Sequence, residues 1–463
     1  MVTQKQNRRR DSLHLVLSVV IIGLLNFVAA SFFTRFDLTQ EKRYTLSSAT
    51  KDLLQNLDDV VYFRVYLEGD FPSGSAGIIR LKNSTREMLD EFRALGGDNI
   101  EYEFINPTES KTKQDQNDIF QQLANKGLHP TFLEVKTKEG TSQQTIFPGA
   151  IASYRGKEIP IQLLKEQFGV SSDEVLNNSV QSLEYEFSNA IRKMLIKIKP
   201  VVGFIQGHQE LDSAHTADIQ KALAEYYEVR NILLSGKVMD LEKINECSAI
   251  IIAKPDTAFS EQDKFIIDQF AMAGGKTLWL IDNVFASMDS LQNTNITYGL
   301  PRPLNLDDQL FKYGVRINND MVLDIKSGAI PIPVNKKYEL LPWYYFPLVG
   351  QSNNHPIVNN MNAVRCEFVS SIDTIGARGI KKTFLLSSSK YTRLLNTPVK
   401  IDIRSVFRKP NEALFNKSSI PVAVLLEGNF ESVFRNRLPP EIDSIKQIKF
   451  IDKCTKPNKM IVV

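Results

Sequence analysis

Four side chains that could bind a metal ion or move a proton crowd one short stretch of the chain. His208, Glu210, Asp212 and His215 lie within eight residues of one another. Imidazole and carboxylate groups are zinc ligands, and a histidine beside a carboxylate is a common proton carrier in hydrolases. The spacing matches none of the usual zinc motifs. A metal site, an acid–base pair and a solvated polar loop are therefore the alternatives at this stretch.

A second stretch, Gly275-Lys276-Thr277, has the ending of a phosphate-binding loop. The full motif needs another glycine at position 270, where the chain has Phe270. The surrounding pattern also runs from a helix into a strand, whereas a phosphate loop runs from a strand into a helix. We therefore expect no nucleotide site here.

The available thiols are Cys247, Cys366 and Cys454, and no CxxC pair occurs. They are too few and too scattered for a disulfide framework or a zinc site. In an enzyme of the glutamine-amidotransferase fold, the nucleophile would follow the apolar strand at 249–253, but Lys254-Pro255 stands there. Cys247 precedes that strand and suits a small core residue. A catalytic triad would therefore lack its first member.

The segments around these residues alternate between apolar strands and amphipathic helices. Over residues 199–330 this pattern predicts a doubly wound parallel sheet of the flavodoxin or glutamine-amidotransferase type. Ligands of such sheets gather at the carboxyl ends of the strands. We predict a loop surface there that contacts a partner or ligand, with no catalytic, cofactor or metal site. Its residues are His208, Glu210, Lys254 and Asp282.

Residues 44–197 have the predicted order β-α-β-α-β-β-α, which resembles the thioredoxin fold. The last two strands are expected at 132–136 and 144–151, and Pro130 sits where that fold usually carries a cis-proline. The redox thiols would lie between Leu67 and Ile78, and no cysteine occurs there. Disulfide exchange needs a thiolate, so we expect a scaffold or binding module.

Residues 331–463 form a β-rich extension whose strands are expected to rejoin the sheet of the second domain. Its Trp343-Tyr344-Tyr345-Phe346 run is either core beneath a long loop or, if exposed, a surface for a partner. The last expected strand begins at Met460, and the pattern stops without a cap. We therefore expect a chain that is truncated at its C-terminus.

The N-terminus predicts a membrane anchor. Leu13–Phe33 is a run of 21 residues without Asp, Glu, Lys or Arg, and a basic tail of residues 1–12 precedes it. Such a helix spans the ~30 Å core of a bilayer, and the positive-inside rule keeps the tail cytoplasmic. A signal peptide cleaved after Ala30 is the alternative. We predict that the span is retained.

Charge excludes one class of partner. The chain holds 56 Lys and Arg against 53 Asp and Glu, a formal net charge of +3. The basic tail before residue 13 accounts for that whole excess. A near-neutral body lacks the basic face that nucleic acids require, so we predict no nucleic-acid binding.

Several short segments carry a family resemblance, and together they follow the family's order along most of the chain. They are Phe36-Asp37-Leu38-Thr39, Lys42-Arg43-Tyr44-Thr45-Leu46-Ser47, Val65-Tyr66-Leu67-Glu68-Gly69-Asp70-Phe71-Pro72, Leu89-Asp90-Glu91-Phe92-Arg93, Asn178-Ser179, Leu183-Glu184-Tyr185-Glu186-Phe187, Gly207-His208 with Glu210, Gly274-Gly275-Lys276 and Pro421-Val422-Ala423-Val424. They resemble the gliding-motility-associated ABC transporter auxiliary proteins of the GldG family, within the broader group of ABC-type auxiliary, or substrate-binding-like, components.

The resemblance implies a non-enzymatic subunit in the inner membrane of gliding bacteria of the Bacteroidetes type. It would have a single N-terminal span, with the bulk of the chain in the periplasm. Its implied partners are a multi-span ABC permease and, through it, a cytoplasmic ATPase, with a dimer as one arrangement. The alternative hypothesis is a cryptic hydrolase or small-molecule-binding enzyme that uses the strand-end crevice.

Some properties have no signal in the sequence. These are the transported substrate, the stoichiometry and the coupling of ATP hydrolysis to the ectodomain. Members of the resembled family usually end in a second, C-terminal span, and whether truncation removed one here stays open.

Overall fold

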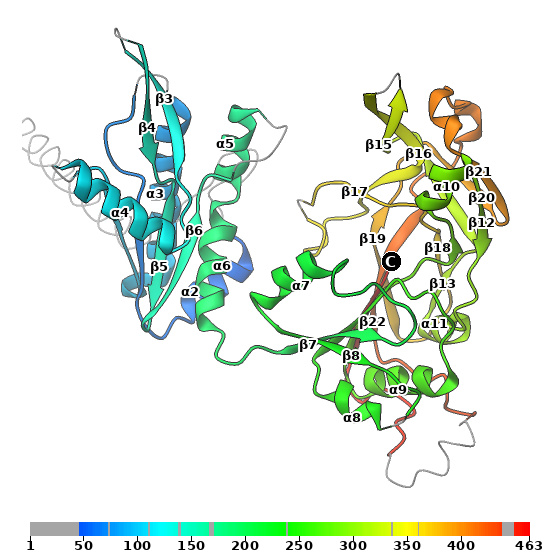
Figure 1. Cartoon of the computed structure of the whole chain (residues 1–463). Helices are drawn as coiled ribbons and strands as arrows, with labels where there is room; N and C mark the ends of the chain where they lie inside the picture. The colour runs from blue at the N-terminus through cyan, green and yellow to red at the C-terminus, as the bar shows by residue number, and fades with distance from the viewer. Residues whose placement is uncertain are drawn as a thin grey trace, which may run out of the picture. The chain divides into compact units, whose positions relative to one another are not determined.

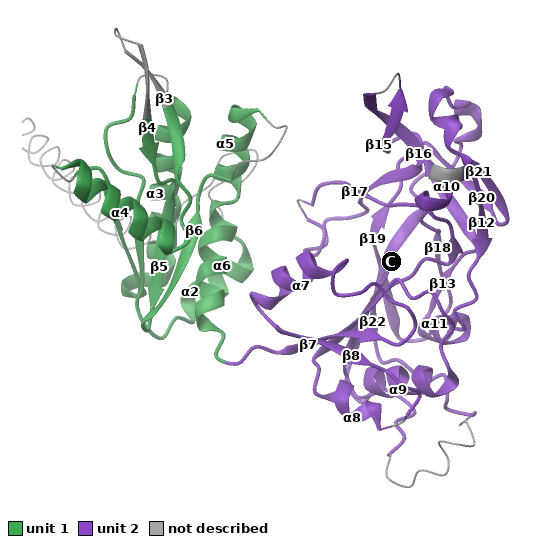
Figure 2. Cartoon of the chain, in the orientation of Figure 1, with its two compact units in different colours: residues 1–197 green, residues 198–463 purple. Residues whose placement is uncertain are grey.

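The structure, a computed structural model, describes residues 46–72, 75–109, 112–137, 140–165, 171–237, 239–334, 337–359, 361–437 and 449–463. The chain divides into two compact units, residues 1–197 and 198–463, called unit 1 and unit 2 below (Figure 2). The predicted tail 1–12 and span 13–33 lie outside the described residues. Among the helices that are described, none is long and apolar enough to cross a bilayer.

Unit 1 is built on a four-stranded mixed sheet in the order β2-β1-β5-β6. β1 (Val61–Val65) runs parallel to β2 (Ile100–Phe104) and antiparallel to β5 (Gly149–Tyr154). β6 (Lys157–Gln162) pairs antiparallel with β5 and closes the sheet. The main sheet is thus mixed and four-stranded, and its fourth strand lies beyond the last strand expected at 144–151.

Helices pack on this sheet through apolar faces. The ring of Phe187 in α6 meets that of Phe63 in β1 edge-on, with 5.2 Å between the centroids. Ser47 caps α2, because its hydroxyl accepts a hydrogen bond from the amide of Thr50. The helices of unit 1 are α2 (Ser48–Gln55), α3 (Ala76–Gly96), α4 (Lys113–Asn125), α5 (Ser172–Gln181) and α6 (Leu183–Leu195).

The predicted last strand pair of unit 1 forms a hairpin, but this hairpin lies outside the main sheet. β3 (Thr131–Thr137) and β4 (Gly140–Ile146) form a separate two-stranded sheet, and the hairpin that completes the main sheet comes one step later. Arg155 and Gly156 join β5 to β6, and both have positive φ, as the tightest hairpin turns require. The bond before Pro130, where the thioredoxin fold usually has a cis-proline, is not cis; in the described residues the cis peptide bond precedes Pro398.

Unit 2 contains a ten-stranded sheet whose parallel part has the order β8-β7-β9-β10-β23 (Figure 1). In chain order this is 2-1-3-4-5, the order of the flavodoxin-type doubly wound sheet. The strands are β7 (Val201–Gln206), β8 (Glu228–Leu233), β9 (Ala249–Ala253), β10 (Lys276–Leu280) and β23 (Asn458–Val462).

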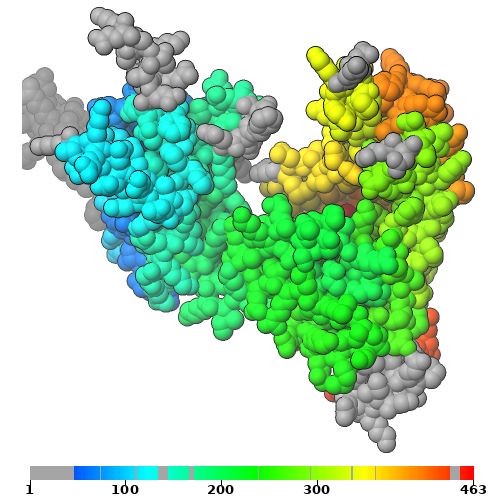
Figure 3. All heavy atoms as spheres, in the orientation of Figure 1, coloured from blue at the N-terminus to red at the C-terminus, as the bar shows by residue number. Residues whose placement is uncertain are grey.

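The C-terminal residues supply the other half of this sheet. Beyond β23 the antiparallel strands β22, β19, β16 and β15 follow, and the tenth strand, β17 (Val364–Arg365), pairs with β16 off this path. β22 lies in orange beside β19 in Figure 1. Their bounds are β15 (Ser327–Val334), β16 (Lys337–Gln351), β19 (Ile380–Ser387) and β22 (Pro421–Gly428). Most of β22 and β23 is buried, and the space-filling view shows little of either strand on this face (Figure 3).

Shorter elements surround the large sheet. The helices are α7 (Ala217–Ala224), α8 (Asp240–Asn245), α9 (Glu261–Met272), α10 (Met288–Thr294) and α11 (Asp307–Tyr313). The strands are β11 (Val284–Phe285), β12 (Ile296–Pro301), β13 (Val315–Ile317), β14 (Asp320–Asp324), β18 (Ile372–Thr374), β20 (Thr392–Asn396) and β21 (Val399–Asp402).

Candidate functional site

The order of the parallel strands creates one place where ligands commonly bind. The chain goes from β7 to β8 on one side and then returns to β9 on the other side of β7. At such a switch point the loops after the two central strands part and leave a crevice at the carboxyl edge. The loop after β7 carries His208 and Glu210, and the loop after β9 begins at Lys254.

His208 is held between two carboxylates. Its Nδ1 lies 3.2 Å from Oε1 of Glu210, and its Nε2 lies 3.3 Å from Oδ2 of Asp263. The imidazole also stacks on the ring of Phe259, with 3.7 Å between the centroids. His208 and Glu210 are only 4% and 7% exposed, so little of either side chain is available to a partner. Aromatic stacking and ion pairing explain why they are buried.

This arrangement determines the charge of the imidazole. Burial lowers the pKa of His208, but its hydrogen bonds to Asp263 and Glu210 outweigh burial and raise the pKa to about 9. Burial raises the pKa of Asp263, but the hydrogen bonds from His208 and Ser260 lower it by more, so the net shift of the pKa is downward. At neutral pH the ring is therefore a cation that donates from both nitrogens. It has no lone pair with which to accept a proton from a nucleophile.

Asp263 is not among the predicted site residues. This residue belongs to the first turn of α9, where Ser260 is the cap and accepts a hydrogen bond from the amide of Asp263. Its carboxylate also accepts hydrogen bonds from the Ser260 hydroxyl and the Gly236 amide. The Ser260-x-x-Asp263 pattern was a usable signal for a capped helix start, although it gives no hint of His208.

The crevice is closed by its own loops. The amide of Leu211 donates to the carbonyl of Ala253, at the end of β9, over 2.9 Å. The amides of Asp256 and Thr257 both donate to the carbonyl of His208, over 2.9 and 3.1 Å. The two loops that part at a usual switch-point site are thus tied together here.

Two ion pairs join the loop after β9 to later segments of the chain. Nζ of Lys254 lies 3.2 Å from Oδ2 of Asp282, so the structure brings together these two predicted residues. Both side chains are partly exposed, unlike His208. Arg302, which the sequence analysis missed, lies 2.9 Å from Oδ1 of Asp256 and donates to the carbonyl of Pro255. Arg302 follows β12, far along the chain, and no local motif marks it.

The metal alternative gains no support from the geometry. Asp212 and His215 pair with each other over 2.7 Å on the exposed surface, whereas His208 and Glu210 are buried. In the part of the chain that the structure describes, no group of three His, Cys, Asp or Glu side chains is arranged to hold a metal ion.

The thiols are also poorly placed for chemistry. Cys247 and Cys454 are buried, and Cys366 is half-buried. Burial raises the pKa of all three, that of Cys366 to about 11. A thiol with a raised pKa is protonated at neutral pH and is therefore a poor nucleophile.

The aromatic run of the C-terminal extension belongs to the core. Trp343 is fully buried and Tyr344 is half-buried, so Trp343 is not the partner surface that the exposed alternative requires. The indole of Trp343 packs against Tyr345, Phe346 and Phe368, with centroids 4.9 to 5.9 Å apart. Its Nε1 donates to the Ser405 hydroxyl over 2.8 Å, which satisfies its polar atom.

Comparisons with known proteins identify relatives for both units. A family model described as "ABC-type uncharacterized transport system" matches residues 199–463, and a domain of unknown function, DUF7088, matches residues 40–153. An uncharacterized protein of Borreliella burgdorferi is 24% identical over 444 residues, which cover 93% of this chain and 80% of the relative.

Two solved structures show weaker likenesses. The mmIFT52 N-terminal domain has a TM-score of 0.32 at 14% identity, over 57% of this chain and 84% of that one. A ThuA-like protein of Bacteroides uniformis has a TM-score of 0.26 at 12% identity, over 50% of this chain and 78% of that one. Likenesses at this level carry no argument about this chain.

Proposed function

Because the chain belongs to the family of auxiliary components of ABC-type uncharacterized transport systems, we propose that it is a non-catalytic, membrane-anchored subunit of such a system. The observation that carries the non-catalytic part is the state of His208. Both of its ring nitrogens are engaged by carboxylates inside a closed crevice. A general base needs a free lone pair within reach of a nucleophile.

The finer proposal follows from the resemblance to the GldG family. The subunit is anchored in the inner membrane by residues 13–33, with units 1 and 2 in the periplasm. Unit 1 is a thioredoxin-like scaffold without thiols. The subunit assembles with a multi-span permease and, through it, with a cytoplasmic ATPase, in gliding motility.

The partly exposed Lys254–Asp282 pair is the predicted contact surface that the geometry still favours. Photo-crosslinking tests it: a photoreactive amino acid replaces Lys254 in the full chain, in cells that express the complete system. We expect a crosslink to the permease. The matched control replaces Lys381, whose side chain is 72% exposed on β19 and which should give no crosslink. Crosslinks from neither position, or from both equally, contradict this surface.

The enzyme alternative predicts a different result. A cryptic hydrolase needs an ionisable group that changes state in a crevice open to substrate. Cells that carry His208→Asn would then lose activity while the amount of folded protein stays unchanged. Our proposal expects that His208→Asn lowers the amount of folded protein. Transport by the cells should then fall only in proportion to that amount.

A further inference from the structure

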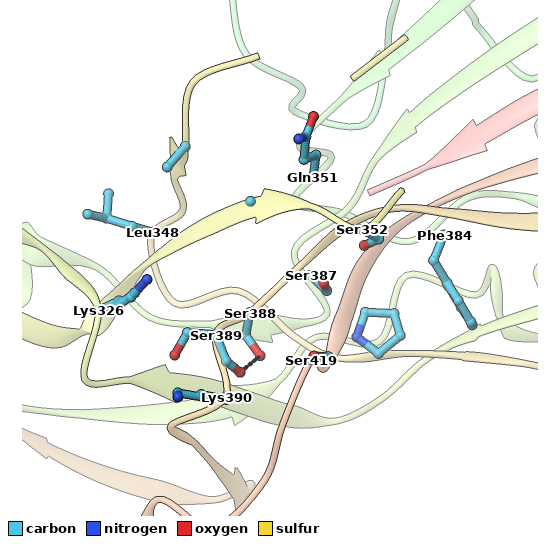
Figure 4. A pocket seen from close by; sticks show the side chains of 13 residues that line it. Lys326, Leu348, Gln351, Ser352, Phe384, Ser387, Ser388, Ser389, Lys390 and Ser419 are labelled. Atoms are coloured by element: carbon cyan, nitrogen blue, oxygen red, sulfur yellow. Dashed lines mark hydrogen bonds between the residues drawn. The ribbon is translucent and has the colours of Figure 1, made fainter. Parts of the chain in front are cut away.

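Unit 2 has an open cavity of about 690 Å³ in its C-terminal half. It lies where β16 and β19 end and β22 begins (Figure 4). Cavities of 300–1,000 Å³ are the usual size of small-molecule sites. The polar residues that line it include Lys326, Ser387, Ser388, Ser389, Lys390 and Ser419.

The cavity shares an edge of the sheet with the closed crevice. Val424 of β22 pairs with Val462 of β23, and Val462 is also in register with Trp279 of β10. β22 runs antiparallel to β10, so its first residue, Pro421, points toward the carboxyl edge of the parallel strands. Ser387 pairs with Pro421. Three strand spacings separate β19 from β10, or about 14 Å.

A buried carboxylate builds one wall of the cavity. Asp324 is fully buried and accepts hydrogen bonds from the amide and the hydroxyl of Ser389, both over 2.6 Å. It also accepts from the amide of Lys326 over 2.8 Å and from the hydroxyl of Thr392 over 3.2 Å. Asp324 therefore fixes the backbones of Lys326 and Ser389 beside each other, so that this wall forms without a ligand.

The lining is rich in donors and has cationic but no acidic side chains. Lys326 and Lys390 are both exposed, and within the described ranges neither has an ion-pair partner. Nζ of Lys390 lies 5.1 Å from the centre of the Tyr391 ring. In those same ranges the Ser352 and Ser387 hydroxyls have no hydrogen-bond partner. The Asp324 carboxylate is fully buried and accepts hydrogen bonds from four donors of the protein.

From this combination we propose that the cavity binds a small organic molecule through a phosphoryl group. Two ammonium groups on flexible stems act as point charges that suit phosphate oxygens, whereas planar carboxylates are best bound by the fork of an arginine. The Ser352 and Ser387 hydroxyls, which have no other partner in the described ranges, donate to the remaining oxygens. Leu348, Phe384 and Pro421 supply the apolar surface for the rest of the ligand. The site goes beyond the proposed subunit role and does not depend on it.

The test is calorimetric titration of the purified full chain with glycerol 3-phosphate, with glycerol as the neutral probe. We expect saturable binding of the phosphate ester only. The double variant Lys326→Gln/Lys390→Gln should bind at least about ten-fold more weakly. The matched control, Lys276→Gln/Lys456→Gln, removes two exposed lysines from the opposite edge of the sheet and should bind as the wild type does.

A second variant fills the cavity without removing charge. A Cβ at Gly350, which lines the cavity on β16, meets no atom within 4 Å, so we expect the fold to tolerate Gly350→Leu and the longer side chain to take up ligand space. It should also abolish binding. No binding to the wild type, or equal binding to both lysine double variants, overturns the proposal.

The phosphoryl group could belong to a phospholipid headgroup or to a soluble phosphate ester. A parallel titration with short-chain phosphatidylglycerol distinguishes these two sources. Tighter binding of the lipid than of glycerol 3-phosphate identifies a phospholipid headgroup, and equal binding identifies a soluble phosphate ester. Both results support the phosphoryl site. Neither titration result depends on whether the chain assembles with a permease and an ATPase.

Discussion

At the scale of single residues, ionisable side chains that could act in catalysis have structural roles in unit 2. His208 ties the loop after β7 to the first turn of α9 through Asp263, 55 positions away in the chain. Asp268, fully buried on the same helix, accepts hydrogen bonds from the Tyr313 and Ser432 hydroxyls. Groups that are often catalytic in open sites thus hold segments together here.

The paired imidazole predicts a pH dependence of stability. The pKa of His208 rises from 6.5 to about 9 on folding, so its protonated form stabilises the fold. A raised pKa gives stability that is complete below pH 6.5 and is lost as the pH rises through 9. The stabilisation is about 3 kcal/mol.

Thermal unfolding of the wild type and of His208→Asn between pH 6 and pH 10 checks this prediction. The wild type should be more stable at pH 6, and the difference should shrink toward pH 10. A difference that stays constant over this range, or grows with pH, would show that the imidazole is not a buried cation.

Part of the environment of His208 and Trp343 could be predicted from the sequence, and part could not. The short spacing of His208 and Glu210 correctly suggests that they meet, because they share one loop. Their burial depends on Phe259 and Asp263, which reach them only through the tertiary fold. The burial of Trp343 also depends on the tertiary fold. Its aromatic neighbours in the chain fit a core or a surface equally well, and its contacts with Phe368 and Ser405 form only when distant segments meet.

At the scale of elements, the loop that closes the crevice depends on one glycine. Gly207 follows β7 with φ +135°, and a Cβ there would lie 2.6 Å from the carbonyl oxygen of Leu234. Gly207→Ala should therefore destabilise unit 2 by about 3 kcal/mol. The matched control is Gly350→Ala, where the backbone is ordinary and the space is open. Chemical denaturation measures both, and equal stabilities would contradict the prediction.

The wall of the open cavity gives a second prediction at this scale. Asp324→Ala leaves the donors of Ser389 and Thr392 without their acceptor, so we expect a loss of about 3 kcal/mol. Hydrogen exchange at the Ser389 amide should become faster, and Asp324→Asn should restore part of the protection. Unchanged exchange in Asp324→Ala would show that the loop is held by other contacts.

Elements with strong local patterns were predictable, and long-range pairings were not. The apolar strand Ala249–Ala253 and the capped helix Glu261–Met272 follow from periodicity and from Ser260. In unit 1 the same alternation fits two consecutive hairpins, and only the turn at Arg155-Gly156 distinguishes the one that joins the main sheet. The sequence leads us to expect that C-terminal strands rejoin this sheet, but no local signal encodes that β23 pairs in parallel with β10, about 180 residues earlier in the chain.

At the scale of the whole molecule, the two units have separate cores. Phe63, Phe92 and Phe187 belong to the core of unit 1, and Ile250, Phe270 and Trp279 belong to that of unit 2. Fragments 46–197 and 199–463 should therefore each unfold cooperatively when expressed alone. Calorimetry of both fragments checks this, and a fragment that is unfolded alone but folded in the full chain would contradict it.

The central claim, an auxiliary subunit of a transport system, is tested most directly by purifying the tagged full chain from native membranes under mild detergent. Quantitative mass spectrometry of the eluate is the measurement. We predict that a multi-span permease and an ATPase are recovered together with the chain in fixed ratios. Recovery of the chain without either protein, from membranes that contain both, would contradict the account.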